Sequence, residues 1–368
     1  MINPYENVDW NNVTEIQSLS HSHSHSQGAN RAFESITSWY EDGIRHFPYS
    51  NYYPSHPSYP ILDDPYWSRG VQEDYTLLRE WIADNNIDDI IEGPNAEHHT
   101  IQDDSENTMS RLHMNGLGSF YSSGNPPDIE PVGARIPWKK VVDNVVENLQ
   151  YPDAGGVTIN HPTWTNQAVS HPLTDDVVFN MLDYDSRVLG IEIYCHPDFD
   201  LELFDRILKT GRRCWGFCSP DHAFPGYKSD LGSAGRNVLL IPSDTPKSEL
   251  EHACLKAYRD GRFFGKLNGK HPTISNSPGL IFTNIDFNVL TNKITVETLY
   301  ADEIECITDK GKQTVNSRSG AFNIPRDAVY ARVQASGLND MIFSNPIIFK
   351  PFVANPSHTV DFIQLFMD

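Results

Sequence analysis

The chain has 368 residues, of which 28 are Lys or Arg and 49 are Asp or Glu, so its formal net charge is −21 at pH 7. A protein that binds long nucleic acids needs basic side chains against the phosphates, and this balance argues against that class. A hydrophobic fraction of 39% and an aromatic fraction of 11% exclude a disordered chain. The length exceeds what one hydrophobic core usually supports, so we expect a large domain and a smaller one.

Several features predict a cytoplasmic protein with no membrane partner. No apolar run is long enough to cross a bilayer, and the N-terminal segment MINPYENVDWNN lacks the basic and apolar regions of a secretory signal. The cysteines are odd in number and scattered, and Cys214 and Cys218 flank the apolar segment WGF, which is typical of a buried strand. We therefore predict reduced thiols. The five cysteines are Cys195, Cys214, Cys218, Cys254 and Cys306.

Residues 1–280 alternate short β-like runs with amphipathic helices. Helical patterns are expected over 31–43, 68–86, 138–150, 173–185, 199–211 and 243–261. Between them come β-like runs at 14–23, 44–51, 87–99, 111–119, 156–162, 188–196 and 214–224. About seven strand–helix units of this kind predict a parallel α/β barrel.

The pattern changes after residue 280. Short runs of alternating polarity at 292–317, 321–337 and 341–352 are separated by Gly, Asn and Asp turns, which is typical of an antiparallel β-sandwich. We therefore expect a barrel over 1–280, a small β-sandwich over 281–352 and a tail over 353–368.

The segment LSHSHSHS, residues 19–26, raises the question of a metal site. Alternate side chains of a strand point the same way, so a strand here would aim His21, His23 and His25 at one side. The alternative is a solvated, low-complexity histidine run. Imidazoles and carboxylates also follow five other β-like runs, where an α/β barrel places its chemistry, and this favours a site. They are Glu97, His98 and His99; His113; His161; Glu192 and His196; and Asp221 and His222.

The types of these side chains indicate which ions they would bind. Neutral imidazole and carboxylate without thiolate suit Zn²⁺, Mn²⁺ or Fe²⁺ rather than a structural cysteine-type zinc site. Because eight or more candidate ligands are present, we expect two or three ions per chain.

The order of these motifs resembles the PHP (polymerase and histidinol phosphatase) family over about residues 15–270. The matching features are the H-x-H segment, the Glu and His on consecutive strands, NHP at 160–162, a late Asp-His followed by Ala-Phe, and CLKAYRDGRFFGK at 254–266. This resemblance implies a distorted seven-stranded (βα) TIM-like barrel that holds two or three divalent ions and hydrolyses phosphate esters. The chain departs from the family at 48–57, where PYSNYYPSHP replaces Thr-Asp-His, and at Pro220-Asp221-His222, where the family has D-x-H.

The resemblance also implies residue roles. The first-motif pair falls on two of His21, His23 and His25, with the last two preferred and His21 as a third ligand or an orienting residue. Glu97 matches the bridging carboxylate, and later histidines of the family match His113, His161 and His222. Glu97, His161 and His222 are the expected catalytic residues. The expected metal ligands are His21, His23, His25, Glu97, His99, His113, His161, His196, Asp221 and His222.

The remaining candidates would act around the ions, which polarise a phosphate ester and activate water. His98 and His99 are adjacent on a strand and point oppositely, so only one faces the site. Glu192 lies among apolar residues, where a carboxylate is costly unless paired, so we expect it to orient a ligand imidazole; His98 is assigned the same role. Arg31 and Arg135 are expected to contact the substrate anion.

The sequence therefore predicts a metal-dependent phosphoesterase that acts on a small phosphorylated substrate. One alternative is a metal-binding or regulatory protein without turnover. The other is a hydrolase of the amidohydrolase kind, which cleaves C–N bonds. That kind usually supplies a carboxylated Lys or a final Asp as base, and no Lys follows a β-like run here.

Overall fold

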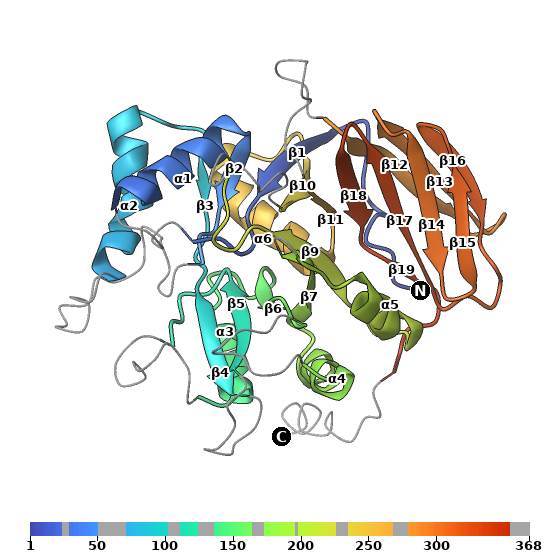
Figure 1. The fold of residues 1–368 in the computed structure, drawn as a ribbon, viewed down its shortest axis with the longest axis horizontal. Coiled ribbons are helices and arrows are strands. Elements are labelled where there is room, and N and C mark those ends of the chain that lie inside the picture. The colour runs from blue at the N-terminus through green and yellow to red at the C-terminus, as the bar shows by residue number, and fades with distance from the viewer. Residues whose placement is uncertain are drawn as a thin grey trace, which may run out of the picture.

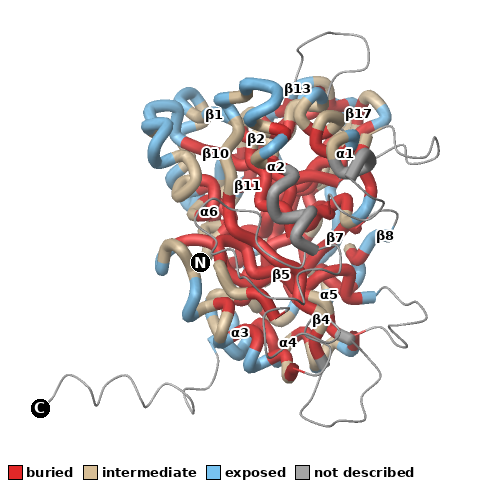
Figure 2. Tube along the Cα trace, turned by 90° about the vertical axis from the view of Figure 1, so that its left-hand side faces the viewer, coloured by how far each residue is buried: buried red, intermediate tan, exposed pale blue. Residues whose placement is uncertain are grey.

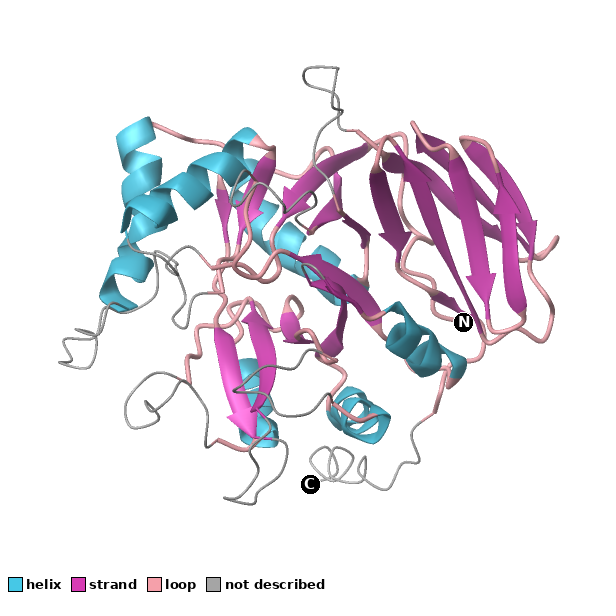
Figure 3. Cartoon of the chain, viewed as in Figure 1, coloured by secondary structure: helices cyan, strands magenta, loops and turns pink. Residues whose placement is uncertain are grey.

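The computed structural model describes residues 1–23, 29–50, 71–101, 111–123, 136–163, 173–195, 198–225, 235–267 and 279–353. Within these ranges the protein is mixed α/β and rich in strands (Figures 1 and 3). None of the helices found there combines the length and the apolar character that crossing a bilayer requires. The helices are α1 (Ala29–Glu41), α2 (Val71–Asn85), α3 (Trp138–Glu147), α4 (Asp175–Tyr184), α5 (Leu201–Lys209) and α6 (Leu250–Asp260), with a 3₁₀ turn at Lys247–Glu249.

The strands form three sheets. The largest has the order β15 (Gly311–Val315), β14 (Glu303–Thr308), β17 (Tyr330–Gly337), β18 (Asp340–Ser344), β11 (Phe263–Lys266), β10 (Arg236–Pro242), β1 (Val13–Ser18), β2 (Ile44–Phe47) and β3 (Ile91–Glu92), with β19 (Ile347–Ile348) paired to β17. The second contains β4 (Glu97–Ile101), β5 (Arg111–Leu117), β6 (Gly156–Ile159), β7 (Val188–Cys195) and β8 (Asp198–Phe199), with β9 (Trp215–Ser219) paired to β7. The third contains β12 (Ile281–Asn288), β13 (Lys293–Leu299) and β16 (Ser319–Asn323).

The predicted (βα) barrel is wrong, because these sheets do not close into a barrel in the part of the chain that the structure describes. The pairs β1–β2, β2–β3, β6–β7 and β7–β9 are parallel, but β1–β10, β10–β11, β4–β5 and β5–β6 are antiparallel. Only residues 102–110 separate β4 from β5, too few for the crossover helix that parallel neighbours need. Helix α6 does lie between β10 and β11, yet the chain returns antiparallel. Alternation of strand and helix in the sequence does not show whether neighbouring strands run parallel or antiparallel.

One buried cluster joins the two larger sheets. It contains side chains from β1, β5, β7, β9, β10 and β11 together with α6, including Ile16, Leu117, Leu189, Phe217 and Tyr258. Figure 2 shows the buried part of the trace running through the middle of the molecule, where β5, β7 and β11 lie. The chain leaves this core at the ends of β1 and β9, and the candidate site begins there.

The strands after residue 280 are antiparallel and share a second buried cluster between the three-stranded sheet and β14, β17 and β18. Strand β13 alternates buried and exposed residues along its length, as expected when one face of a sheet covers a core. These strands are continuous with the rest of the protein, because β18 pairs with β11, as in Gly265 opposite Phe343. The N-terminus also lies beside them (Figure 1), and Ile2 bridges to Ile348.

Candidate metal centre

The segment after β1 presents two of its histidines to one side, as an extended chain requires. Ser22 forms a parallel bridge with Asp221, and the Ser22 carbonyl accepts a hydrogen bond from Ser50 N at 3.0 Å. His23 N in turn donates to the Asp221 carbonyl at 3.0 Å. The side chains on either side of Ser22 therefore converge, with His21 Nε2 only 3.3 Å from His23 Nε2.

Glu97, at the start of β4, lies at the centre of the cluster and is 3% exposed. Its Oε1 atom lies 3.1 Å from His113 Nδ1 and 3.8 Å from His161 Nε2. Its Oε2 atom lies 3.1 Å from His23 Nε2 and 3.2 Å from His99 Nε2. Oε1 also lies 3.4 Å from His21 Nε2, so the two oxygens of one carboxylate face different sets of imidazoles, three at Oε1 and two at Oε2.

Asp221, just after β9, is the second carboxylate. Its Oδ1 atom lies 3.3 Å from His21 Nε2, 3.4 Å from His23 Nε2 and 3.5 Å from His222 Nε2. The His222 ring stacks on that of His23, with centroids 4.3 Å apart. Asp221 and His161 have φ values of 51° and 27°, a conformation that residues other than Gly rarely adopt and that clusters at functional sites.

Glu192, in the middle of β7, is buried, and both of its carboxylate oxygens have polar contacts. Its Oε1 atom lies 2.8 Å from His21 Nδ1 and accepts a hydrogen bond from Ser219 Oγ at 2.5 Å. Its Oε2 atom accepts a hydrogen bond from the backbone N–H of His161 at 2.7 Å. This carboxylate orients one imidazole and fixes the backbone of another, which leaves His21 Nε2 directed at Glu97 and Asp221.

The carboxylates of the cluster remain ionised although Glu97 is buried and Asp221 is only partly exposed. Burial by itself would raise their pKa values, but the surrounding imidazoles lower the pKa of Glu97 and of Asp221 well below the usual range. Conversely, burial would lower the pKa of His21 and His23, but the neighbouring carboxylates raise both. The ionised carboxylates therefore attract positive charge, which protonated imidazoles or a bound metal ion can supply.

Two histidines of the cluster are neutral near pH 7. Burial lowers the pKa of His113 to about 4. Partial desolvation, together with the His23 imidazole, lowers the pKa of His222. Neutral imidazole is the form that binds a metal ion.

The donor set fits divalent metal ions. Among the described residues, five groups of three ligand atoms, each with its atoms within 4.8 Å of one another, overlap because several residues belong to more than one group; these are His21, His23, Glu97, His161 and Asp221. Imidazole nitrogen and carboxylate oxygen suit Zn²⁺, Mn²⁺ or Fe²⁺. The groups include His21, His23 and Glu97; Glu97, His113 and His161; His21, His161 and Asp221; His23, Asp221 and His222; and one with a thiol, His21, Glu192 and Cys195.

Most of the residues expected from the sequence come together here. His99 and His113, opposite each other on β4 and β5, stack with ring centroids 3.8 Å apart. His98 points to the other face of β4, where its Nδ1 atom lies 2.9 Å from Ser123 Oγ, so the structure does not bring it to the cluster. His25, His196 and Arg135 lie outside the described residues, as does the side chain of Arg31. His21, which the resemblance placed outside the preferred pair, lies inside the cluster.

Sequence reasoning missed the polar residues that support these side chains. Ser219 hydrogen-bonds to Glu192, and Asn160 Nδ2 lies 3.5 Å from Glu97 Oε1. Asn95 and Asn115 are buried beside the segment that carries His21. The only sequence feature that could have indicated such a role is the position of Asn160, which directly precedes His161 in NHP.

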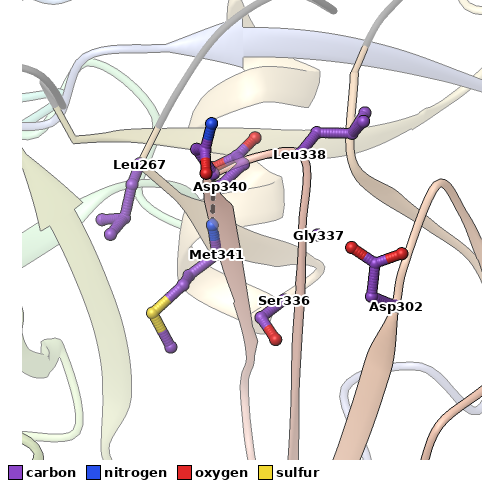
Figure 4. A pocket seen from close by; sticks show the side chains of 8 residues that line it. Leu267, Asp302, Ser336, Gly337, Leu338, Asp340 and Met341 are labelled. Carbon is purple, nitrogen blue, oxygen red and sulfur yellow. Dashed lines mark hydrogen bonds between the residues drawn. The ribbon is translucent and has the colours of Figure 1, made fainter.

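A cavity of about 650 Å³ lies elsewhere, at the turn between β17 and β18 (Figure 4). Asp302 and Asp340 contribute carboxylates to it, and Leu267, Leu338 and Met341 contribute apolar groups. No histidine or cysteine is among the described residues that line it. We therefore place the candidate site at the histidine cluster.

Comparison with known proteins identified no relative: no family model, no curated protein and no solved structure matches this chain.

Proposed function

We propose that this protein is a metal-dependent hydrolase, and that its substrate is a small phosphate ester. The observation that carries the proposal is the position of Glu97, whose two oxygens face different sets of imidazoles within a buried cluster. A carboxylate in this position is suited to bridge two divalent ions.

The cluster residues would have distinct roles in metal binding. Glu97 and Asp221 would hold the ions together with the neighbouring imidazoles, and Glu192 would keep His21 oriented toward them. Bound Zn²⁺, Mn²⁺ or Fe²⁺, two or three per chain, would supply Lewis acidity toward the ester and lower the pKa of a water molecule.

His161 and His222 are the proposed catalytic histidines beside Glu97. His161 is buried and held by its backbone hydrogen bond to Glu192, so its ring can bind an ion or donate to a phosphoryl oxygen. The His222 side chain is 46% exposed, which puts it within reach of a substrate entering from solvent. Its lowered pKa keeps the ring available as a ligand or proton acceptor at neutral pH.

Phosphate esters are favoured over amides by two observations. The order of the motif residues along the chain resembles that of the PHP phosphoesterases even though the described strands form no closed barrel. Among the described residues, no lysine belongs to the metal-binding groups, and the fully buried Lys266 instead donates to the Leu280 carbonyl at 2.9 Å. The carboxylated lysine typical of the amidohydrolase kind thus has no counterpart there.

A cytoplasmic location remains part of the proposal. It is supported by the five cysteines, all of which are buried thiols without a disulfide.

The test has two parts. Metal analysis of the purified protein is expected to find Zn, Mn or Fe at two or three ions per chain; a metal-free protein that also fails to take up Mn²⁺ would contradict the proposal. Assays with Mn²⁺ should then compare a phosphomonoester, a phosphodiester, a lactone and an amide. Turnover of the phosphate esters is expected. Turnover of the amide or lactone alone would identify the amidohydrolase-like alternative, and metal binding without any turnover would identify a regulatory protein.

A further inference from the structure

Four asparagines are buried beneath the proposed metal centre. Asn95, Asn115, Asn160 and Asn237 are each at most 2% exposed. A buried amide is costly unless both of its ends are hydrogen-bonded, so the partners of these side chains indicate what they hold in place.

Three of the asparagines converge on Ser20, the residue before His21. The Ser20 carbonyl accepts hydrogen bonds from Asn115 Nδ2 at 2.7 Å and from Asn95 Nδ2 at 3.0 Å. The Ser20 hydroxyl oxygen accepts a third from Asn237 Nδ2 at 2.9 Å. The carbonyl of the peptide that joins Ser20 to His21 is therefore held by Asn115 of β5 and by Asn95, which lies between β3 and β4.

Asn115 also connects Ser20, through Asn160, to the proposed ligands Glu97, His113 and His161. Its Oδ1 atom accepts a hydrogen bond from Asn160 Nδ2 at 3.0 Å, so both ends of the Asn115 amide are used. Asn160 directly precedes His161, and its backbone N–H donates to the carbonyl of His113 at 3.0 Å. The same Nδ2 atom of Asn160 lies 3.5 Å from Glu97 Oε1.

These contacts matter because the proposed metal centre spans two sheets. His21 follows β1 of the largest sheet, whereas His113 lies on β5 and His161 follows β6 in the second sheet. The described strand pairs give β1 no pairing with β5 or β6. Side-chain hydrogen bonds through Asn115 provide a direct link between them.

We propose that Asn115 and Asn160 are positioning residues that hold the ligands of the two sheets at metal-binding separation before any ion arrives. The inference rests on the proposed metal centre and goes beyond it, because neither side chain needs to touch an ion. Supporting residues of this kind typically contribute 10- to 100-fold to metal affinity.

Asn345 offers a matched control. It is equally buried, its Nδ2 atom donates to the carbonyls of Gly261 and Phe263 at 3.0 and 3.1 Å, and its Oδ1 atom accepts from Gly216 N at 2.8 Å. It is thus the same kind of amide clamp, and none of these partners belongs to the metal-binding groups.

The experiment measures Mn²⁺ affinity by calorimetry and Mn²⁺ coordination by electron paramagnetic resonance in the full-length protein, alongside thermal unfolding. Asn115→Ser and Asn160→Ser are expected to weaken Mn²⁺ binding about 10- to 100-fold and to alter the resonance spectrum. Asn345→Ser is expected to lower the unfolding temperature while binding Mn²⁺ as the wild type does. Asn160→Ser breaks the same link from the side of β6, so it supplies the measurement if Asn115→Ser does not fold.

The two proposals can fail separately. If the wild type binds Mn²⁺ and the Asn115 and Asn160 variants bind it as tightly as Asn345→Ser, the positioning role is overturned while the metal centre stands. If the purified wild type contains no Zn, Mn or Fe and also binds no Mn²⁺, the metal centre is overturned and the positioning role with it.

Discussion

Glu192 and His21 form a fully buried carboxylate–imidazole pair, with Glu192 Oε1 2.8 Å from His21 Nδ1. The carboxylate belongs to β7 and the imidazole to the segment after β1, so the pair joins the two larger sheets. Ser219 Oγ and the backbone N–H of His161 complete the hydrogen bonding of Glu192. A ligand imidazole held through its second nitrogen by a carboxylate is a recurrent arrangement in metal sites.

Replacement of this carboxylate should weaken metal binding. We expect Glu192→Gln to reduce Mn²⁺ affinity about 10- to 100-fold, because the amide no longer supports the His21 ring with a negative charge. Calorimetric titration with Mn²⁺ checks this. Glu297→Gln, at an exposed position of β13, is the control and should bind Mn²⁺ normally. Equal affinity in the two variants would show that Glu192 is only a satisfied core residue.

Loss of the central ligands should remove activity without unfolding the protein. We expect Glu97→Gln to abolish ester hydrolysis and to reduce the number of bound ions, because the amide is a poor bridging group. His161→Ala should likewise abolish hydrolysis, since it removes a ring that faces Glu97. Activity, metal content and circular dichroism are measured together. Retained turnover in both variants would refute the assignment.

Stability should depend on pH through Glu15 on β1. Burial raises the pKa of Glu15 from 4.5 to about 7, although Lys266 opposes the shift. Between these values the folded protein keeps a proton that the unfolded chain has released, so the contribution of Glu15 to the free energy of unfolding falls as pH rises.

Glu15→Gln should remove this pH dependence. At pH 8 the variant is expected to be more stable than the wild type by about 1–2 kcal/mol, allowing for the partial exposure of Glu15, and at pH 4 the two should be similar. Urea unfolding at the two pH values, with Glu297→Gln as the exposed control, checks this. A difference that does not change with pH would contradict it.

The thiols should be unreactive in the folded protein. All five cysteines are buried, and burial raises the pKa of each thiol, to about 12 for Cys214 and Cys306 and well above its usual value for Cys195. Because thiolate is the reactive form, we expect a disulfide reagent at pH 8 to label none of them in the native protein and all five in denaturant. Rapid labelling of the native protein would contradict this.

The local parts of the fold could be predicted from the sequence, but the directions of the strands could not. The helical patterns at 138–150 and 173–185 correspond to α3 and α4, since an apolar stripe identifies the face that packs on a sheet. Pairing direction depends on which sheet edge receives the returning strand, and β10 and β11 are antiparallel despite the helix between them.

The candidate site was predictable only at the level of residue type. His21, His23, Glu97, His113, His161 and Asp221 could be singled out because imidazole and carboxylate bind metal ions. The asparagines beside them could not be singled out, because an asparagine in a β-like run does not by itself indicate a role at a metal site. Their importance depends on contacts between elements far apart in the chain, such as Asn115 and Ser20.

The pairing of β11 with β18 has a consequence for dissecting this protein. A fragment ending near residue 280 would leave the outer side of β11 without its neighbour, with Phe264 and Lys266 no longer opposite Ser344 and Ile342. An open strand edge of this kind recruits edges from other molecules. Removal of the C-terminal strands would therefore yield a chain that self-associates through β11, rather than a smaller, independently stable fragment.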